Sequence, residues 1–184
     1  MLDTYKFIEK YKRISIIGME KNVGKTTLLN KLIADIGTNK KLGLTSIGRD
    51  GEDIDVVTNT DKPRIYVRRG SIIATGRNCL AKCDITKEIL YVTDFTTPMG
   101  SIVIVRALSD GYVDIAGPSY NKQVKIVVEL MEKFGSEISI VDGALGRKST
   151  AISDVSEATI LSTGAALSLD MLKVVEETKK TVYF

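Results

Sequence analysis

Apolar residues along this chain gather in two kinds of pattern, short continuous runs and longer runs with helical spacing. Residues 13–18, "RISIIG", form a compact apolar run typical of a buried strand. In residues 25–36 the apolar positions recur at helical spacing, and Gly37 follows as a natural stop (Leu28, Leu29, Leu32, Ile33 and Ile36). A second strand-like run covers residues 42–48. Strand, glycine turn, helix and strand in this order predict a parallel βαβ unit.

The stretch from Pro63 to Gly117 has a different pattern of short, β-branched runs separated by glycines. It predicts a strand-rich insertion or sheet extension with antiparallel pairs. The strand-like runs are "RIYV", "SIIAT", "EILYVTDF", "SIVIVRAL" and "GYVDIAG", and "GRNCLAKC" among them is helical in pattern.

Alternation of strands and helices returns after residue 118. Helical spacing covers Ser119–Phe134 and Ala165–Lys180, and strands are expected in "EISIVDGALG" and in Glu157–Gly164. A short amphipathic helix is expected over Thr4–Tyr11. The whole pattern predicts a single α/β domain over residues 1–184, with a mainly parallel central sheet and helices on both faces.

Composition narrows the chemistry of this chain. Of its 184 residues 43% are hydrophobic and 27% charged, and the net charge of +3 is dispersed, which argues against nucleic acid as a partner. No run is apolar enough to predict a membrane span or a secretion signal, so we expect a cytoplasmic protein. The chain has no histidine, and Cys79 and Cys83 lack the ligand count of a zinc site. Catalysis would therefore need carboxylates, lysines, a phosphate-binding loop and a metal ion.

The strongest motif is "GMEKNVGKTT", residues 18–27. It places Gly24, Lys25 and Thr26 in the Gly-Lys-Thr order of a phosphate-binding loop, with five residues between Gly18 and Gly24 instead of four. A strand feeding a glycine loop that opens a helix is the context in which backbone N–H groups and the helix dipole bind phosphate. We expect Lys25 to contact phosphate and Thr26 to hold Mg²⁺. The predicted phosphate contacts are Gly18, Lys21, Asn22, Val23, Gly24, Lys25, Thr26 and Thr27, and the alternative is a helix start without a ligand.

A second acidic group is expected at the end of a buried strand. Asp142 in "ISIVDGALG" fits best and is predicted to serve Mg²⁺ and catalysis, with a loop-capping carboxylate as the alternative interpretation. Asp94 in "LYVTDF" is its rival. Asp50 and Glu52 follow the second strand, where they would hold metal or sense the terminal phosphate, unless they only form a solvated acidic loop.

The spacing of the loop is similar to that of dethiobiotin synthetase and its relatives among the P-loop proteins related to signal-recognition and MinD-type ATPases. "VDGALG" resembles the Val-Glu-Gly-Ala-Gly-Gly turn of that enzyme, with Asp142 in place of the glutamate and Leu145 in place of one glycine. The resemblance implies a P-loop NTPase fold with ATP and Mg²⁺ as cofactors. These motifs cover about a third of the chain and do not specify the reaction.

A wider set of segments resembles the ATP-binding subunit of the reactivating factor for lysine 5,6-aminomutase. The segments are "GLTSIGRDGE", "KPRIYV", "YVTDFTTPMG", "ALSDGYVDIAGPS", "VDGALGRKS" and "ATILSTGAALS". The resemblance implies an ATPase that works with a second, MutS-like ATPase subunit to restore an adenosylcobalamin-dependent aminomutase, and relatives longer than this chain. These two proteins are the expected partners, and a homodimer is the alternative assembly. Arg147 and Lys148 could neutralise phosphate charge, although we interpret them as a solvated basic loop.

Two other functions compete with the reactivase. The first is an ATP-dependent ligase or kinase of the dethiobiotin synthetase type, although the loop after the second strand, residues 48–52, has no lysine for a carbamate or carboxylate. The second is a regulatory GTPase, but Asn-Lys-x-Asp is absent and "NKQV" at Asn121 has valine in the acidic place. ATP is therefore the expected nucleotide.

Overall fold

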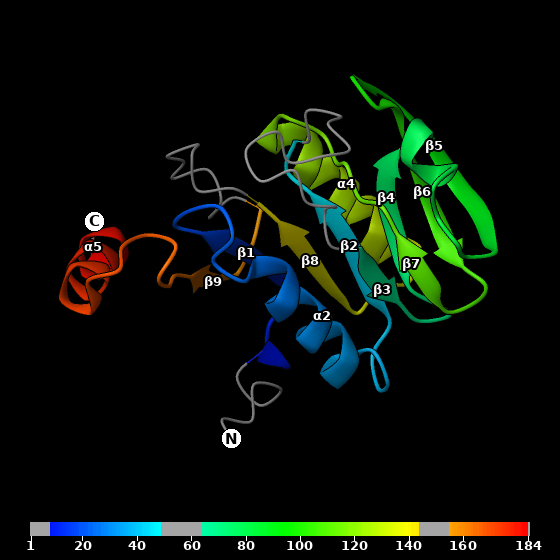
Figure 1. Ribbon diagram of the computed structural model, residues 1–184. Coiled ribbons are helices and arrows are strands. Elements are labelled where there is room, and N and C mark those ends of the chain that lie inside the picture. The colour runs from blue at the N-terminus through cyan, green and yellow to red at the C-terminus, as the bar shows by residue number, and fades with distance from the viewer. Residues whose placement is uncertain (1–7, 49–63, 144–154, 184) are drawn as a thin grey trace.

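A computed structural model describes residues 8–48, 64–143 and 155–183 of the chain, which adopt an α/β fold (Figure 1). The central sheet has seven strands in the order β5-β6-β4-β2-β8-β1-β9. In chain order these are β1 (Arg13–Gly18), β2 (Leu42–Ser46), β4 (Ile72–Gly76), β5 (Lys87–Thr97), β6 (Gly100–Ala107), β8 (Ile138–Asp142) and β9 (Ala158–Ser162). A second sheet pairs β3 (Ile65–Val67) with β7 (Gly111–Val113). The helices are α2 (Lys25–Ile36), α3 (Arg77–Leu80), α4 (Asn121–Lys133) and α5 (Met171–Tyr183).

The sheet is mostly parallel, as the alternation of elements predicted. Strands β4, β2, β8, β1 and β9 run in one direction, and β6 joins the sheet antiparallel to β4 and to β5. The predicted βαβ unit of β1, α2 and β2 forms, but β8 lies between its two strands and pairs with both. The carboxyl ends of β1, β2 and β8 therefore meet at one edge, which is where ligands bind in such sheets.

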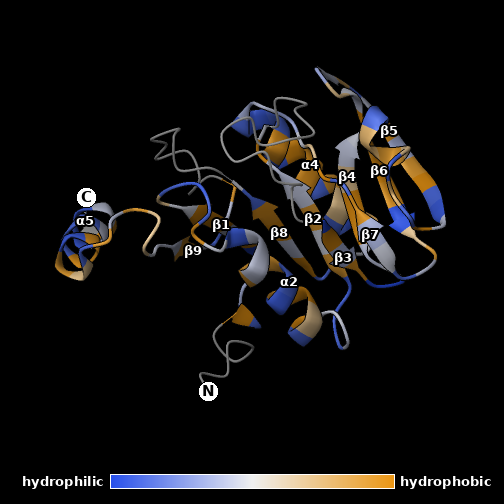
Figure 2. Cartoon of the chain, viewed as in Figure 1, coloured by the Kyte–Doolittle hydropathy of each residue, from blue (hydrophilic) through white to orange (hydrophobic). Residues whose placement is uncertain are grey.

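Helices α2 and α4 cover opposite faces of the sheet, and each buries one apolar stripe. Leu29, Leu32, Ile33 and Ile36 of α2 are buried in a core with β1, β2 and β6. On the opposite face Val124, Val127, Val128 and Met131 of α4 pack on β4, β6 and β8. Because the central strands are covered on both faces, their sequences read as largely apolar runs, of which β8 is orange over most of its length in Figure 2.

The stretch 63–117 is a sheet extension in which antiparallel pairs occur, as expected. Strands β4, β5 and β6 belong to the central sheet, and only β3 and β7 form a separate pair. One prediction within this stretch is wrong in part, because β7 ends at Val113 and the rest of "GYVDIAG" is not a strand. Instead, residues 114–118 cross the carboxyl ends of β4 and β2 as a strap, described below.

Helix α5 begins at Met171, later than the predicted start at Ala165. Asp170 stops the helix from extending backwards, because its Oδ1 accepts the Leu172 N–H at 2.9 Å in the manner of an N-cap. The helix lies at the outer end of the molecule, beyond β9 (red in Figure 1). The first half of the expected helix over Thr4–Tyr11, residues 4–7, lies outside the described residues. None of the helices in the described ranges combines the length and hydropathy that crossing a membrane requires.

Candidate functional site

The candidate phosphate loop, residues 18–26, connects the end of β1 to the start of α2 as the sequence predicted. The loop leaves the sheet beside β9, because the Met19 N–H donates a hydrogen bond to the Ser162 carbonyl at 2.9 Å. Its position at the carboxyl edge of the parallel strands is the place where the fold directs a ligand.

Two residues in this loop have left-handed backbone conformations. They are Asn22, with φ 60°, and Gly24, with φ 84°. Asparagine and glycine are the residues that adopt this conformation at least cost. Gly24 is the N-cap of α2 and has no side chain to bond the first N–H groups of the helix. The first turn of α2 therefore presents donors and the positive end of its dipole to an anion.

Gly18 explains the unusual spacing of the motif. A β-carbon at this position would lie 2.7 Å from Val23 Cγ2 and 2.8 Å from Lys25 Cδ. Both side chains therefore cross directly over Gly18, and the stem of Lys25 runs back along the loop. A glycine is needed at position 18, with five residues between it and Gly24, because any side chain there would occupy the path of the lysine.

The polar ends of Lys25 and Thr26 are open to a ligand. Both residues are half-buried at the start of α2. Within the described residues neither the Lys25 ammonium nor the Thr26 hydroxyl has a hydrogen-bond or ion-pair partner. A half-buried ammonium without a carboxylate is a group that attracts phosphate rather than one that stabilises the fold.

Asp142 lies on the strand directly beside the phosphate loop. In the parallel register Asp142 pairs with Ile16 of β1 and with Ser46 of β2. Its main chain is held on both sides, since its carbonyl accepts the Ile47 N–H at 2.7 Å and the Gly143 N–H donates to the Ile16 carbonyl at 2.9 Å. The rival Asp94 is exposed on β5, at the far edge of the sheet beyond β8, β2, β4 and β6. Asp142 is therefore the acidic residue that the topology brings to the loop.

Several predicted site residues lie outside the described residues. Asp50 and Glu52 fall between residues 48 and 64, and Arg147 and Lys148 fall between residues 143 and 155. Within the described ranges no three acidic or cysteine side chains come together as a metal cluster. Thr26 and Asp142 are thus the described candidates for a metal ion, and they fit Mg²⁺, which takes few protein oxygens and completes its shell with phosphate and water.

A strap formed by residues 114–118 closes the carboxyl edge beside the site, and sequence reasoning missed it. The Thr75 hydroxyl donates to the Asp114 carbonyl at 3.0 Å and accepts the Ala116 N–H at 2.9 Å. The Gly117 N–H donates to Ser46 Oγ at 2.9 Å. A β-carbon on Gly117 would lie 1.9 Å from the Ser46 carbonyl oxygen, so only glycine fits. In the sequence, the glycines of "DGYVDIAGPS" are the feature that could have indicated this close approach.

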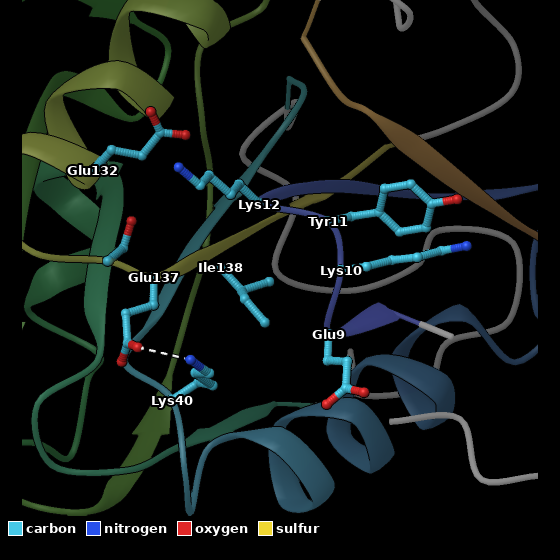
Figure 3. A pocket seen from close by; sticks show the side chains of 9 residues that line it. Glu9, Lys10, Tyr11, Lys12, Lys40, Glu132, Glu137 and Ile138 are labelled. Carbon is cyan, nitrogen blue, oxygen red and sulfur yellow. Dashed lines mark hydrogen bonds and ion pairs between the residues drawn. The ribbon is translucent and has the colours of Figure 1, made fainter. Parts of the chain in front are cut away.

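The amino ends of β1, β2 and β8, opposite the candidate phosphate loop, border a polar cavity of about 480 Å³. Residues such as Lys12, Lys40, Glu132 and Glu137 line it (Figure 3). Two of its acidic side chains, Glu132 and Glu137, are already engaged. Glu137 accepts the Lys41 N–H at 2.9 Å and pairs with Lys40 Nζ at 3.1 Å, and these two hydrogen bonds lower the pKa of its carboxyl. Glu132 binds the Arg13 guanidinium with both oxygens, at 2.7 and 2.8 Å. This cavity is separate from the candidate phosphate loop.

No protein-family model matches this chain, and the searches of curated proteins and of solved structures found no match either.

Proposed function

We propose that residues 18–26 bind the phosphates of a nucleoside triphosphate. The observation that carries the proposal is the path of Lys25, whose stem crosses Gly18 and whose ammonium has no partner within the described residues. The loop N–H groups at the start of α2 supply further donors. A buried, sequestered lysine would favour a purely structural role, and neither condition applies here.

The residues present fit a magnesium ion bound together with the nucleotide. Thr26 would hold it through its hydroxyl and Asp142 through its carboxylate, directly or through water. When bound, Mg²⁺ would neutralise charge on the phosphates. The work of this chain would be to cradle the phosphates with backbone N–H groups and to place the Lys25 ammonium beside them.

We propose ATP as the nucleotide. The nearest matches to a guanine-reading Asn-Lys-x-Asp motif are "NKQV" and "NKKL", whose last residues, Val124 and Leu42, are buried in the core. A buried valine or leucine can neither replace the aspartate nor reach a base. No other segment of the chain has the guanine motif.

The biological role we propose is that of an ATPase subunit that helps to reactivate an adenosylcobalamin-dependent aminomutase together with a second ATPase subunit. The support is the set of segments that resemble such a subunit and the apolar side chains of Ile89, Tyr91 and Val92, which are exposed along the edge strand β5 and could contact a protein partner. The spacing from Gly18 to Gly24 favours a second candidate, an ATP-dependent ligase or kinase acting on a small molecule.

Calorimetric titration of the parent and of Lys25→Ala with Mg-ATP and Mg-GTP tests the site. We expect ATP binding by the parent and an affinity at least about tenfold lower in Lys25→Ala, because a charge-assisted hydrogen bond is lost. Lys31→Ala is the matched control, since Lys31 lies on the same helix and pairs with Asp35 instead. Equal ATP affinity in the parent and in Lys25→Ala would reject the site.

Turnover separates the two candidate functions. A reactivase subunit should hydrolyse ATP slowly alone and faster when an aminomutase holding inactivated cobalamin and the second subunit are added. A ligase or kinase should need only a small substrate. Stimulation by small carboxylates or amines, with no response to the protein partners, would reject the reactivase proposal.

A further inference from the structure

Helix α5 has an apolar surface that residues 8–48, 64–143 and 155–170 do not cover. No side chain from Met171 to Val182 is buried. Leu172 is 74% exposed, Val175 46% and Val182 62%, and Met171 and Leu169 are also exposed. The spacing of Leu172, Val175 and Val182 puts these three side chains on one stripe of the helix. A stripe of this kind normally packs against another helix.

A hollow beside α5 is large enough to accept a side chain. A cavity of about 310 Å³ lies between the helix and Thr163, which follows β9. Five residues of α5 line it, Val174, Val175, Thr178, Lys179 and Val182. The last four occupy positions i, i+3, i+4 and i+7, the four residues that surround one inserted side chain when two helices pack as knobs into holes.

We propose that α5 of a second copy of this chain packs antiparallel against α5. In this arrangement Val175 of each copy enters the hollow of the other. Leu172 then lies opposite Val182 of the partner, and Val175 lies opposite the aliphatic stem of Lys179. The two-fold arrangement uses the same stripe twice, as isologous dimers do.

Charges on α5 agree with this pairing. The Lys180 ammonium already lies 3.5 Å from Glu176 and 3.0 Å from Glu177 of its own helix. Lys179 has no ion-pair partner within residues 8–48, 64–143 and 155–183. In the antiparallel pair the ammonium of Lys179 comes within reach of Glu176 on the other copy, so each interface gains two opposite-charge contacts.

The position of α5 leaves room for a second copy. The helix is the outermost element beyond β9, so two molecules can meet there without contact between their sheets (Figure 1). A helix of 13 residues is about 20 Å long, and two of them bury less area than a standard protein interface. We therefore expect a weak dimer that depends on concentration.

The surface is also connected to the candidate phosphate loop. Thr178 Oγ1 lies 3.3 Å from Met19 Sδ in that loop and 3.2 Å from Thr163 Oγ1. The dimer does not require nucleotide binding, so a failed nucleotide titration would leave this inference intact.

Sedimentation equilibrium of the full chain tests the pairing. We expect the parent to pass from a monomer of 20.1 kDa to a dimer between about 1 µM and 1 mM, the range of weak complexes. Val175→Glu should weaken association on the order of a hundredfold, because it puts a carboxylate into the hollow. Ile126→Glu is the matched control, because Ile126 is 43% exposed on α4, outside the proposed interface. The dimer of this variant should have the same dissociation constant as the parent dimer. A parent that stays monomeric over this whole range would overturn the inference and leave the face to a different protein. Equal changes in the dimer dissociation constant for Val175→Glu and Ile126→Glu would also overturn it.

A charge exchange between copies tests the antiparallel register. Glu176→Lys and Lys179→Glu should each lose dimerisation when alone, because like charges then face each other. An equimolar mixture of the two variants should form heterodimers in native mass spectrometry, since both contacts become attractive. Contacts within one helix cannot produce this rescue. A mixture that dimerises no better than either variant alone would reject the register and the pairing.

Discussion

The amino ends of β1, β2 and β8 form one polar edge of the sheet, the amino edge, and their carboxyl ends form another, the carboxyl edge. The polar groups of the two edges have different partners. At the amino edge Arg13 binds Glu132 with two hydrogen bonds. Glu137 accepts the Lys41 main-chain N–H and also pairs with Lys40, the contact that Figure 3 marks with a dashed line. At the carboxyl edge Lys25 and Thr26 have no such partners within the described residues. Glu132 and Glu137 of the amino edge are neutralised by their basic partners, whereas the Lys25 ammonium of the carboxyl edge has no carboxylate beside it within the described residues.

The two edges also differ in what builds them. Side chains hold the amino edge together through their ion pairs. The carboxyl edge depends on glycines: Gly18 and Gly117 let a lysine stem and a strap approach closely, and Gly24 takes the positive φ at the start of α2. Substitutions at the carboxyl edge should therefore act through steric conflict, and those at the amino edge through charge.

The largest effect is expected from Gly117→Ala. Its β-carbon would overlap the Ser46 carbonyl oxygen, a main-chain atom that cannot move without disturbing the end of β2. We expect a loss of about 2–4 kcal/mol in the free energy of unfolding, measured by urea denaturation. Gly164→Ala is the control, because no atom lies within 4 Å of the β-carbon it would add. Equal losses in the two variants would contradict the role of the strap.

Gly18→Ala should affect the ligand more than the fold. The added β-carbon meets Val23 and Lys25 side-chain atoms, which can move, so we expect little change in thermal stability. Displacing the stem of Lys25 should lower ATP affinity about tenfold in calorimetric titration. An unchanged affinity would mean that the path of Lys25 over Gly18 is not required for binding, and the proposal would lose its main support.

The smallest effect is expected at the amino edge from Glu137→Gln. Hydrogen bonds from Lys41 and Lys40 lower the pKa of the Glu137 carboxyl in the folded state. The stabilisation is therefore fully present above the unfolded pKa and is lost as the pH falls through the lowered folded pKa. Its size is small because the side chain is 44% exposed.

Urea denaturation over a pH series measures the difference in free energy of unfolding between the parent and Glu137→Gln. The free-energy gap between parent and Glu137→Gln should be constant near neutral pH and disappear in acid. The exposed carboxyl of Glu129 on α4 supplies a control variant, Glu129→Gln. A gap that widened in acid would contradict the assigned ion pair, and ATP affinity should be the same in all three proteins.

Elements with a strong local pattern were predictable from the sequence. The bounds of β1 and of α2 agree with the runs "RISIIG" and residues 25–36, and the end of β8 at Asp142 was also expected. The start of α5 was placed too early because the apolar spacing continues before Asp170, while the cap of that residue decides where the helix begins. The length of β7 was overestimated because "GYVDIAG" has the composition of a strand.

The sequence by itself determined the α/β class, the strand–loop–helix unit and the presence of Gly24, Lys25 and Thr26 at the helix start. These features depend on residues close together in the chain. Only the tertiary structure decided that β8 lies between β1 and β2, that Asp142 is beside the loop while Asp94 is not, and that Gly117 lies against Ser46. Such contacts join residues far apart in the chain, and local spacing carries no information about which strands pair.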